Sequence, residues 1–236
     1  MSIWSRFAEL LTSTAFNAFS SVIEAVRTAF EGDPATRRRV AFSIAMIALS
    51  AKMAKADGVV TQPEITAFYQ IFDVPLSDRP NVTRLYTLAQ QDVAGYQAYA
   101  TQMAQLCGGA EKDCPVLEDI LDGLFHIAKA DGLVHEQELG FLEDVAGIFG
   151  ISETHYEFIL ARHVETGKRD PYAVLGIDRS LSFIEARKAW LKLVQENHPD
   201  LMIARGLPDE FIAIATARLA AINAAYEQIE REKKAA

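Results

Sequence analysis

Four carboxylates stand at matching positions in a segment that the chain contains twice. The segment from Ala54 to Ile65 aligns with the segment from Ala128 to Leu139, at an offset of 74 residues. Each copy holds an Asp-Gly pair followed by a Glu, and together they supply Asp57, Glu64, Asp131 and Glu138. If the copies face each other with pseudo-two-fold symmetry, these carboxylates would repel one another unless a cation neutralised them. The repeat is therefore a candidate site for a divalent cation.

The spacing within each copy matches the second half of an EF-hand loop, where a Gly permits the turn and the last Glu binds calcium through both oxygens. The first half does not match, because its first two ligand positions hold Met53 and Lys55, or Ile127 and Lys129. A purely structural alternative also fits. Each Asp-Gly would end a helix, and each Glu would lie in the first turn of the next, where the helix dipole favours it.

The repeated segments carry a resemblance to the TerB family over residues 35–165. The shared signature is Lys-Ala-Asp-Gly-x-Val-x-x-x-Glu, which runs from Lys55 to Glu64 and from Lys129 to Glu138. The family is helical and is linked to tellurite resistance and to membrane-associated stress proteins. The resemblance implies divalent-cation binding through the four carboxylates named above.

A second group of reactive residues is His198-Pro199-Asp200, in which an imidazole and a carboxylate flank a proline. A string of three residues is weak alone and needs its context. The context is an Asp-Pro-Tyr-Ala-Val-Leu-Gly stretch from Asp170, an aromatic Trp190 before the His, and Ala-Ala-Tyr-Glu-Gln-Ile ending at Ile229. Residues 170–236 resemble the J-domain family on this combination.

One branch of that family is a closer match. The segment from Glu196 to Ile229 is similar to the membrane-anchored bacterial J-proteins of the DjlA type. Those proteins join a TerB domain to a C-terminal J-domain, which is the order found here. They begin with a membrane-spanning segment that this sequence does not show.

The J-domain resemblance implies a contact mechanism, so we do not expect an enzyme. A J-domain binds a DnaK-type chaperone in its ATP state, and the His-Pro-Asp turn contacts the region that joins the ATPase and substrate domains. The residues expected to bind DnaK are His198, Pro199, Asp200, Lys188, Lys192 and Arg187. Leu191, Glu196 and Leu201 stand where many J-domains have basic residues, and this should slow association and weaken its salt dependence.

The hydrophobic periodicity predicts an all-α protein and no strand. Helices are expected at 62–72, 80–92, 95–107, 114–130, 136–149, 152–164, 170–176, 182–196 and 209–231, with the tripeptide in a loop between the last two. The uncharged segment from Val40 to Ala51 predicts a central, buried helix. The expected domains are an N-terminal amphipathic helix (1–32), a TerB-like helical bundle with its internal pseudo-repeat (33–165), and a J-domain built as a helical hairpin (166–236).

The amphipathic helix at residues 2–30 has two readings. It could dock on its own domain or dimerise with a second copy. Its large apolar side chains, Trp4 among them, also suit a peripheral membrane contact, although its polar face is poor in Lys and Arg.

Charge and cysteine content argue against nucleic-acid-binding and zinc-binding proteins. The net charge is −9, of which −8 falls in residues 31–169 (12 basic against 20 acidic side chains), and this argues against nucleic-acid binding. Cys107 and Cys114 match no zinc spacing and are expected to be buried, reduced thiols. Without a secretory signal or a membrane-spanning run, we expect a cytoplasmic protein, free or at the cytoplasmic face of the inner membrane.

The sequence thus predicts a J-domain co-chaperone that recruits a DnaK-type chaperone and stimulates its ATP hydrolysis. The TerB-like domain would set its location or its client, whose identity no residue indicates. The alternative is a TerB-type cation-responsive stress protein whose J-domain is only an interaction module. No cofactor is required for the first function, whereas the second uses the divalent cation at the repeat.

Overall fold

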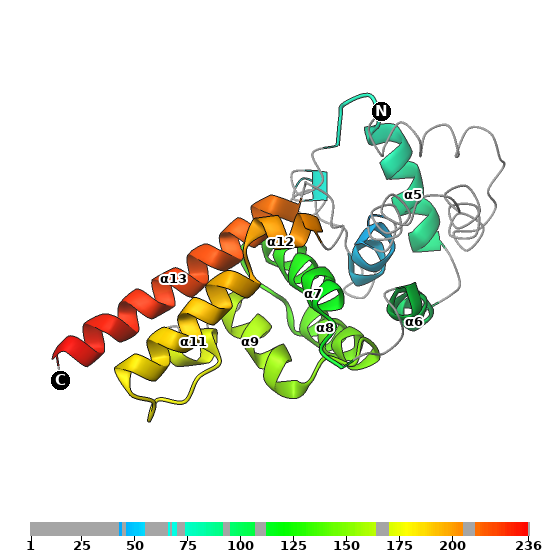
Figure 1. The fold of residues 1–236 in the computed structure, drawn as a ribbon. Coiled ribbons are helices and arrows are strands. Elements are labelled where there is room, and N and C mark those ends of the chain that lie inside the picture. The colour runs from blue at the N-terminus through cyan, green and yellow to red at the C-terminus, as the bar shows by residue number, and fades with distance from the viewer. Residues whose placement is uncertain are drawn as a thin grey trace.

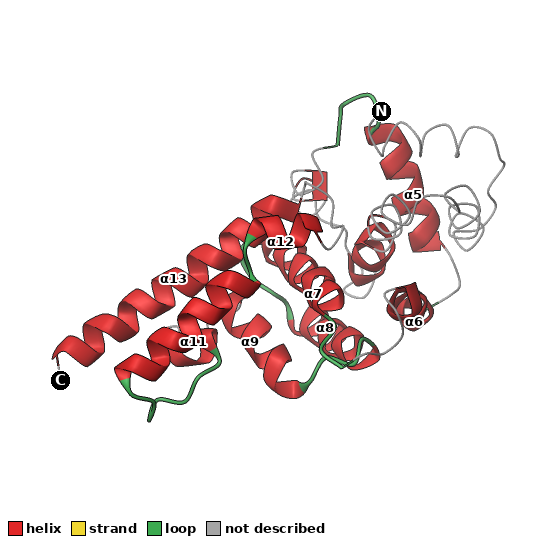
Figure 2. Cartoon of the chain, in the orientation of Figure 1, coloured by secondary structure: helices red, strands yellow, loops and turns green. Residues whose placement is uncertain are grey.

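Every secondary-structure element among the described residues of the computed structural model is a helix (Figure 2). The structure describes residues 43, 46–54, 66, 68–69, 74–91, 95–106, 112–163, 170–204 and 211–235. The predicted all-α class is confirmed for this part of the chain. The predicted helix at residues 2–30 and the expected domain boundary at 165/166 lie outside it. No helix of the described residues has the length and apolar character needed to cross a membrane.

The helices follow the predicted ones to within a few residues, except that most of the helix predicted at 62–72 lies outside the described residues. They are α5 (Arg79–Gln91), α6 (Tyr96–Leu106), α7 (Pro115–Ala128), the 3-10 turn η1 (Lys129–Asp131), α8 (Glu136–Ile148), α9 (Glu153–His163), α10 (Pro171–Leu175), α11 (Phe183–Glu196), α12 (Pro199–Ala204) and α13 (Ile212–Ala235). The difference is α12, which occupies part of the predicted loop. It begins at Pro199, whose fixed φ suits the first helical position and whose missing N–H is not needed there.

The first hydrophobic core lies in the N-terminal part of the fold. Residues 46–54 form a helix with side chains that are nearly all buried, as the uncharged segment predicted. This helix lies in the core with α7, whose Leu117, Leu124 and Phe125 are fully buried. Cys114, just before α7, is a buried free thiol as expected, while Cys107 lies outside the described residues.

The second, smaller core lies between α10, α11 and α13. The Asp170 side chain starts α10 by accepting the Tyr172 N–H at 3.0 Å. A capping box of Ser182 and Glu185 starts α11. α11 runs beside α13 (Figure 1), and across this pair the Trp190 ring stacks on a tyrosine of α13 with centroids 4.3 Å apart.

α13 joins the two cores. Its first turn and the residue before it bring Phe211, Ile214 and Ala215 into the first core, whereas its later turns bring Ile222 and others into the second. The start of α13 comes close to Gly123 on α7, where an added Cβ would lie 3.0 Å from the Phe211 ring. The two parts therefore share one helix and pack directly on each other.

Candidate functional site

The predicted tripeptide lies where α11 passes into α12: His198 precedes α12, and Pro199 and Asp200 are its first two residues. We call this junction the turn. The side chains of His198 and Asp200 are 51% and 85% exposed. The Asp200 N–H donates to His198 Nδ1 at 3.2 Å, and the Leu201 N–H donates to the His198 carbonyl at 2.9 Å. Because Nδ1 accepts, the neutral ring carries its proton on Nε2. The turn is thus ordered by hydrogen bonds within it, one of them to the His198 ring, while both polar side chains stay accessible to an outside partner.

The three predicted basic residues lie on α11, the helix that leads into this turn. Arg187, Lys188 and Lys192 are all exposed. Lys192 lies 3.6 Å from Glu196, one turn later, and this pair is also exposed. Leu191, noted above as a departure from the usual basic residue, is 44% exposed on the same helix. α11 therefore presents a mixed surface in which positive charge is diluted by an acidic and an apolar side chain.

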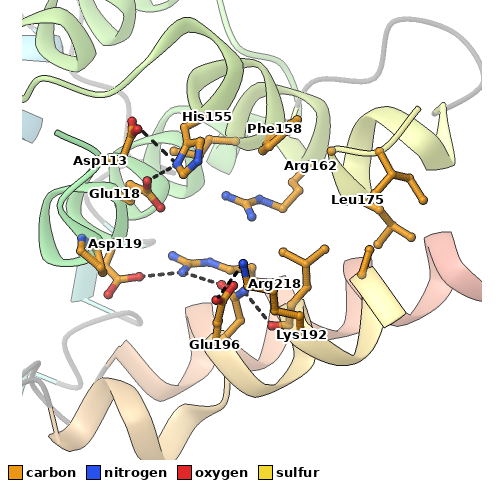
Figure 3. Close-up of a pocket in the computed structure, with 17 residues that line it drawn as sticks. Asp113, Glu118, Asp119, His155, Phe158, Arg162, Leu175, Lys192, Glu196 and Arg218 are labelled. Atoms are coloured by element: carbon orange, nitrogen blue, oxygen red, sulfur yellow. Dashed lines mark hydrogen bonds and ion pairs between the residues drawn. The ribbon is translucent and has the colours of Figure 1, made fainter. Parts of the chain in front are cut away.

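A cavity of about 470 Å³ lies between the N-terminal and C-terminal parts (Figure 3). Side chains of α7, α9, α10, α11 and α13 line it. Those that carry charge or an imidazole are Asp113, Glu118, Asp119, His155, Arg162, Lys192, Glu196 and Arg218. One of the predicted DnaK contacts, Lys192, thus borders the interface between the two parts of the fold.

Arg218 of α13 ties the two parts together at one side of this cavity. Its guanidinium donates to Asp119 Oδ1 at 2.6 Å and to Asp122 Oδ2 at 3.1 Å, and Figure 3 shows Asp119 and Arg218 pointing toward each other. It also donates to Asn197 Oδ1 at 3.2 Å. Arg162 of α9 lies 3.3 Å from Asp122. All four charged side chains of this ion network are at most 11% exposed.

The network explains the charge states of its members. Burial by itself raises the pKa of the Asp122 carboxyl, but Arg218 and Arg162 hold that pKa well below its ordinary value. Burial lowers the pKa of the Arg218 guanidinium, and the two aspartates outweigh this effect and raise the pKa. Buried charges of this kind are stable only when they are paired. Sequence reasoning did not single out these residues.

A second cluster at the cavity consists of Asp113, Glu118 and His155. Their ligand-type atoms all lie within 4.8 Å of one another, which is close enough to hold a metal ion. The same atoms also interact directly: His155 Nδ1 contacts Glu118 Oε1, and Asp113 Oδ1 accepts the Ser152 N–H at 2.6 Å. The cluster joins residues distant in sequence, so no spacing signal predicted it. Hydrogen bonding accounts for its geometry.

The structure describes few of the predicted metal ligands. Asp57, Glu64 and the side chain of Asp131 lie outside the described residues. Asp131 ends η1, and Gly132 follows with a φ of +103°. Glu138 is buried, and its Oε2 accepts the His135 N–H at 2.8 Å at the start of α8. Glu138 thus lies in the first turn of α8, as the structural alternative expected, and cation binding by the four carboxylates stays a prediction.

Comparison with known proteins finds a family model that matches the N-terminal part and relatives that match most of the chain. The model of the family described as tellurite resistance protein TerB matches residues 43–163. The Co-chaperone protein DjlA of Photobacterium profundum is 28% identical over 222 residues, covering 83% of this chain and 79% of that protein. The protein of that name from Coxiella burnetii is 27% identical over 199 residues, covering 76% and 73%. No solved structure matches.

Proposed function

Because this chain belongs to the TerB family and is a DjlA-type J-protein co-chaperone, we propose that it recruits a DnaK-type chaperone and stimulates its ATP hydrolysis. The observation that carries this proposal is the exposed, ordered turn of His198, Pro199 and Asp200 at the end of α11. Arg187 and Lys188 are exposed on the same helix and suit an acidic partner surface.

The mechanism needs no covalent step in this chain. The α11 side chains would guide the encounter by charge, and the turn would then contact the chaperone through the His198 ring and the Asp200 carboxylate. Because those contacts favour the hydrolysis-competent arrangement of the chaperone, the hydrolytic chemistry belongs to the chaperone. The partly apolar surface of α11 suggests an association that depends less on salt than charge pairing alone would.

The test is single-turnover ATP hydrolysis by the cognate DnaK with and without the full chain. We expect stimulation by the wild type, and its loss in the His198→Gln and Asp200→Asn variants. Glu230→Gln is the matched control. It neutralises a partly exposed carboxylate of α13 that pairs with Lys234, away from the turn. Stimulation that survives in both tripeptide variants would refute the proposal. DnaK binding without stimulation by the wild type would favour the interaction-module alternative.

We further propose that the TerB-like domain, residues 43–163, selects the location or client. The support is that the ion network fixes this domain to the J-domain, so a partner held there stands at a defined place relative to the turn. In cells, proximity labelling by the full chain and by His198→Gln should then mark the same proteins apart from DnaK. Loss of those proteins in the variant would show that DnaK, and not this domain, selects them.

A further inference from the structure

The residue between α11 and the tripeptide is linked by hydrogen bonds to the other domain. Asn197 ends α11, directly before His198, and its side-chain amide donates to the Leu193 carbonyl at 2.8 Å. Its amide oxygen accepts a hydrogen bond from Arg218 at 3.2 Å. Both hydrogen-bonding ends of Asn197 are therefore engaged, which fixes the rotation of the residue from which the tripeptide departs.

Arg218 is in turn held by the TerB-like domain. Its guanidinium has a planar fork of donors, and here three directions of that fork are used: toward Asp119, toward Asp122 and toward Asn197. The first two partners lie on α7, and α7 is rigidly packed, with Leu121 and Leu124 fully buried. Because two buried carboxylates hold the guanidinium of Arg218, it has one orientation. The N–H that donates to Asn197 therefore points in a fixed direction.

The docking of the two domains leaves the turn open. His198 and Asp200 remain half and largely exposed, so the TerB-like domain does not cover them. The contacts between the domains can therefore support the turn, and they do not block a partner's access to it.

We infer that Asp119 and Asp122 of the TerB-like domain position the His198-Pro199-Asp200 turn through Arg218 and Asn197. The inference rests on the proposed function for its consequence in the chaperone cycle. These are positioning residues, because none of the four is required to touch the chaperone. The chain through them makes the TerB-like domain part of the apparatus that stimulates DnaK, in addition to any role in location or client choice.

The first test replaces Asn197, which is part-buried and belongs to neither hydrophobic core. In Asn197→Ala the acceptor for Arg218 is gone, and we expect maximal stimulation of DnaK to fall by about tenfold, the loss of about 1.4 kcal/mol of transition-state stabilisation. The concentration of this protein that gives half-maximal stimulation should change less than twofold, since α11 still binds. Asn197→Asp keeps an acceptor for Arg218 but loses the donor to the Leu193 carbonyl, so it should restore part of the activity.

The matched control is Asn223→Ala on α13. It removes the hydrogen bond from Trp190 Nε1 to Asn223 Oδ1, which is 2.9 Å long and lies between the same two helices. We expect it to leave maximal stimulation within twofold of the wild type. Equal losses in the Asn197 and Asn223 variants, or no loss in Asn197→Ala, would overturn the inference.

Amide hydrogen exchange in the full chain tests the positioning without DnaK. The Asp200 and Leu201 N–H groups bond to His198 and report on the turn. Asp119→Ala, a change in the other domain, should speed their exchange while the middle of α11 keeps its protection. Unchanged exchange at both amides would refute the positioning. If exchange responds as expected but the wild type does not stimulate DnaK, the positioning stands and the proposed function fails.

Discussion

Replacing Arg218 by Met tests whether the ion network holds the two domains together. Arg218 is 5% exposed, and its guanidinium lies 2.6 Å from an Asp119 oxygen and 3.0 Å from an Asp122 oxygen. Met has a similar length without charge, so the variant leaves Asp119 buried without this cation, while Asp122 keeps Arg162 at 3.3 Å. Removing one partner of a buried pair costs about 3–5 kcal/mol, and we expect the free energy of unfolding at pH 7 to fall by that amount.

The loss should depend on pH in a defined direction. In the wild type the pKa of Asp122 is well below its unfolded value, so its stabilising contribution is present above about pH 4 and is lost as the pH falls further. In Arg218→Met the pKa of the buried Asp119 should rise above its unfolded value, because the charged form has lost its partner. Protonation then relieves the penalty. The difference between the two proteins should therefore be largest at neutral pH and shrink as the pH approaches 4.

The measurement is urea unfolding of both full-length proteins at pH 7 and pH 4.5. The control is Arg179→Met, which breaks the exposed pair with Asp170 and should cost less than about 1 kcal/mol. The double variant Asp119→Leu with Arg218→Met should recover part of the loss, since it removes both charges. A loss below about 1 kcal/mol for Arg218→Met, or one that does not change with pH, would refute the reasoning.

Three further predictions concern the stability of the chain, and the first two bear on the junction of the domains. Because α13 brings Phe211 to one core and Ile222 to the other, the full chain should unfold in one transition by far-UV circular dichroism and by fluorescence, and two separate transitions would contradict a shared helix. Gly176→Ala should lower the free energy of unfolding by about 1–3 kcal/mol, because Gly176 has a φ of +63° and its Cβ would lie 2.1 Å from the Phe158 ring. Gly140→Ala, inside α8 with nothing within 4 Å of the new Cβ, should instead raise it by about 0.5–1 kcal/mol in the same urea assay.

The sequence predicted the helices well because their signals are local. Ser182 and Glu185 stand three residues apart at the start of α11, which is the pattern of a capping box, and Gly176 ends α10 with a positive φ. The tripeptide was also recognisable, since its context lies within one short stretch of chain. α12 was missed because Pro199 was read as a residue of a loop, although the same proline can start a helix.

The interface was not predicted, because it depends on side chains that are far apart in sequence. A signal was nevertheless present. Arg218 stands between Ala215 and Ile222 at helical spacing, so it lies within the apolar stripe of α13. Asp119 and Asp122 likewise interrupt the buried face of α7, which is otherwise apolar. A charge inside an apolar stripe indicates a buried partner of opposite sign. What the sequence alone could not give is which charges meet, because that depends on how the helices pack.

The use of charge at this interface is informative, because a buried ion pair is not the usual source of stability between packed helices. Replacing a buried ion pair by well-packed apolar side chains is often neutral or stabilising, so the network is weak evidence for stability as such. Apolar side chains can slide or rotate on one another, whereas Arg218 between Asp119 and Asp122 accepts one orientation of α13 on α7. That orientation also places the Arg218 N–H that donates to Asn197. It thereby fixes the position of Asn197, the residue directly before His198. The cost of burying these charges is thus best explained by the orientation of the turn that they define.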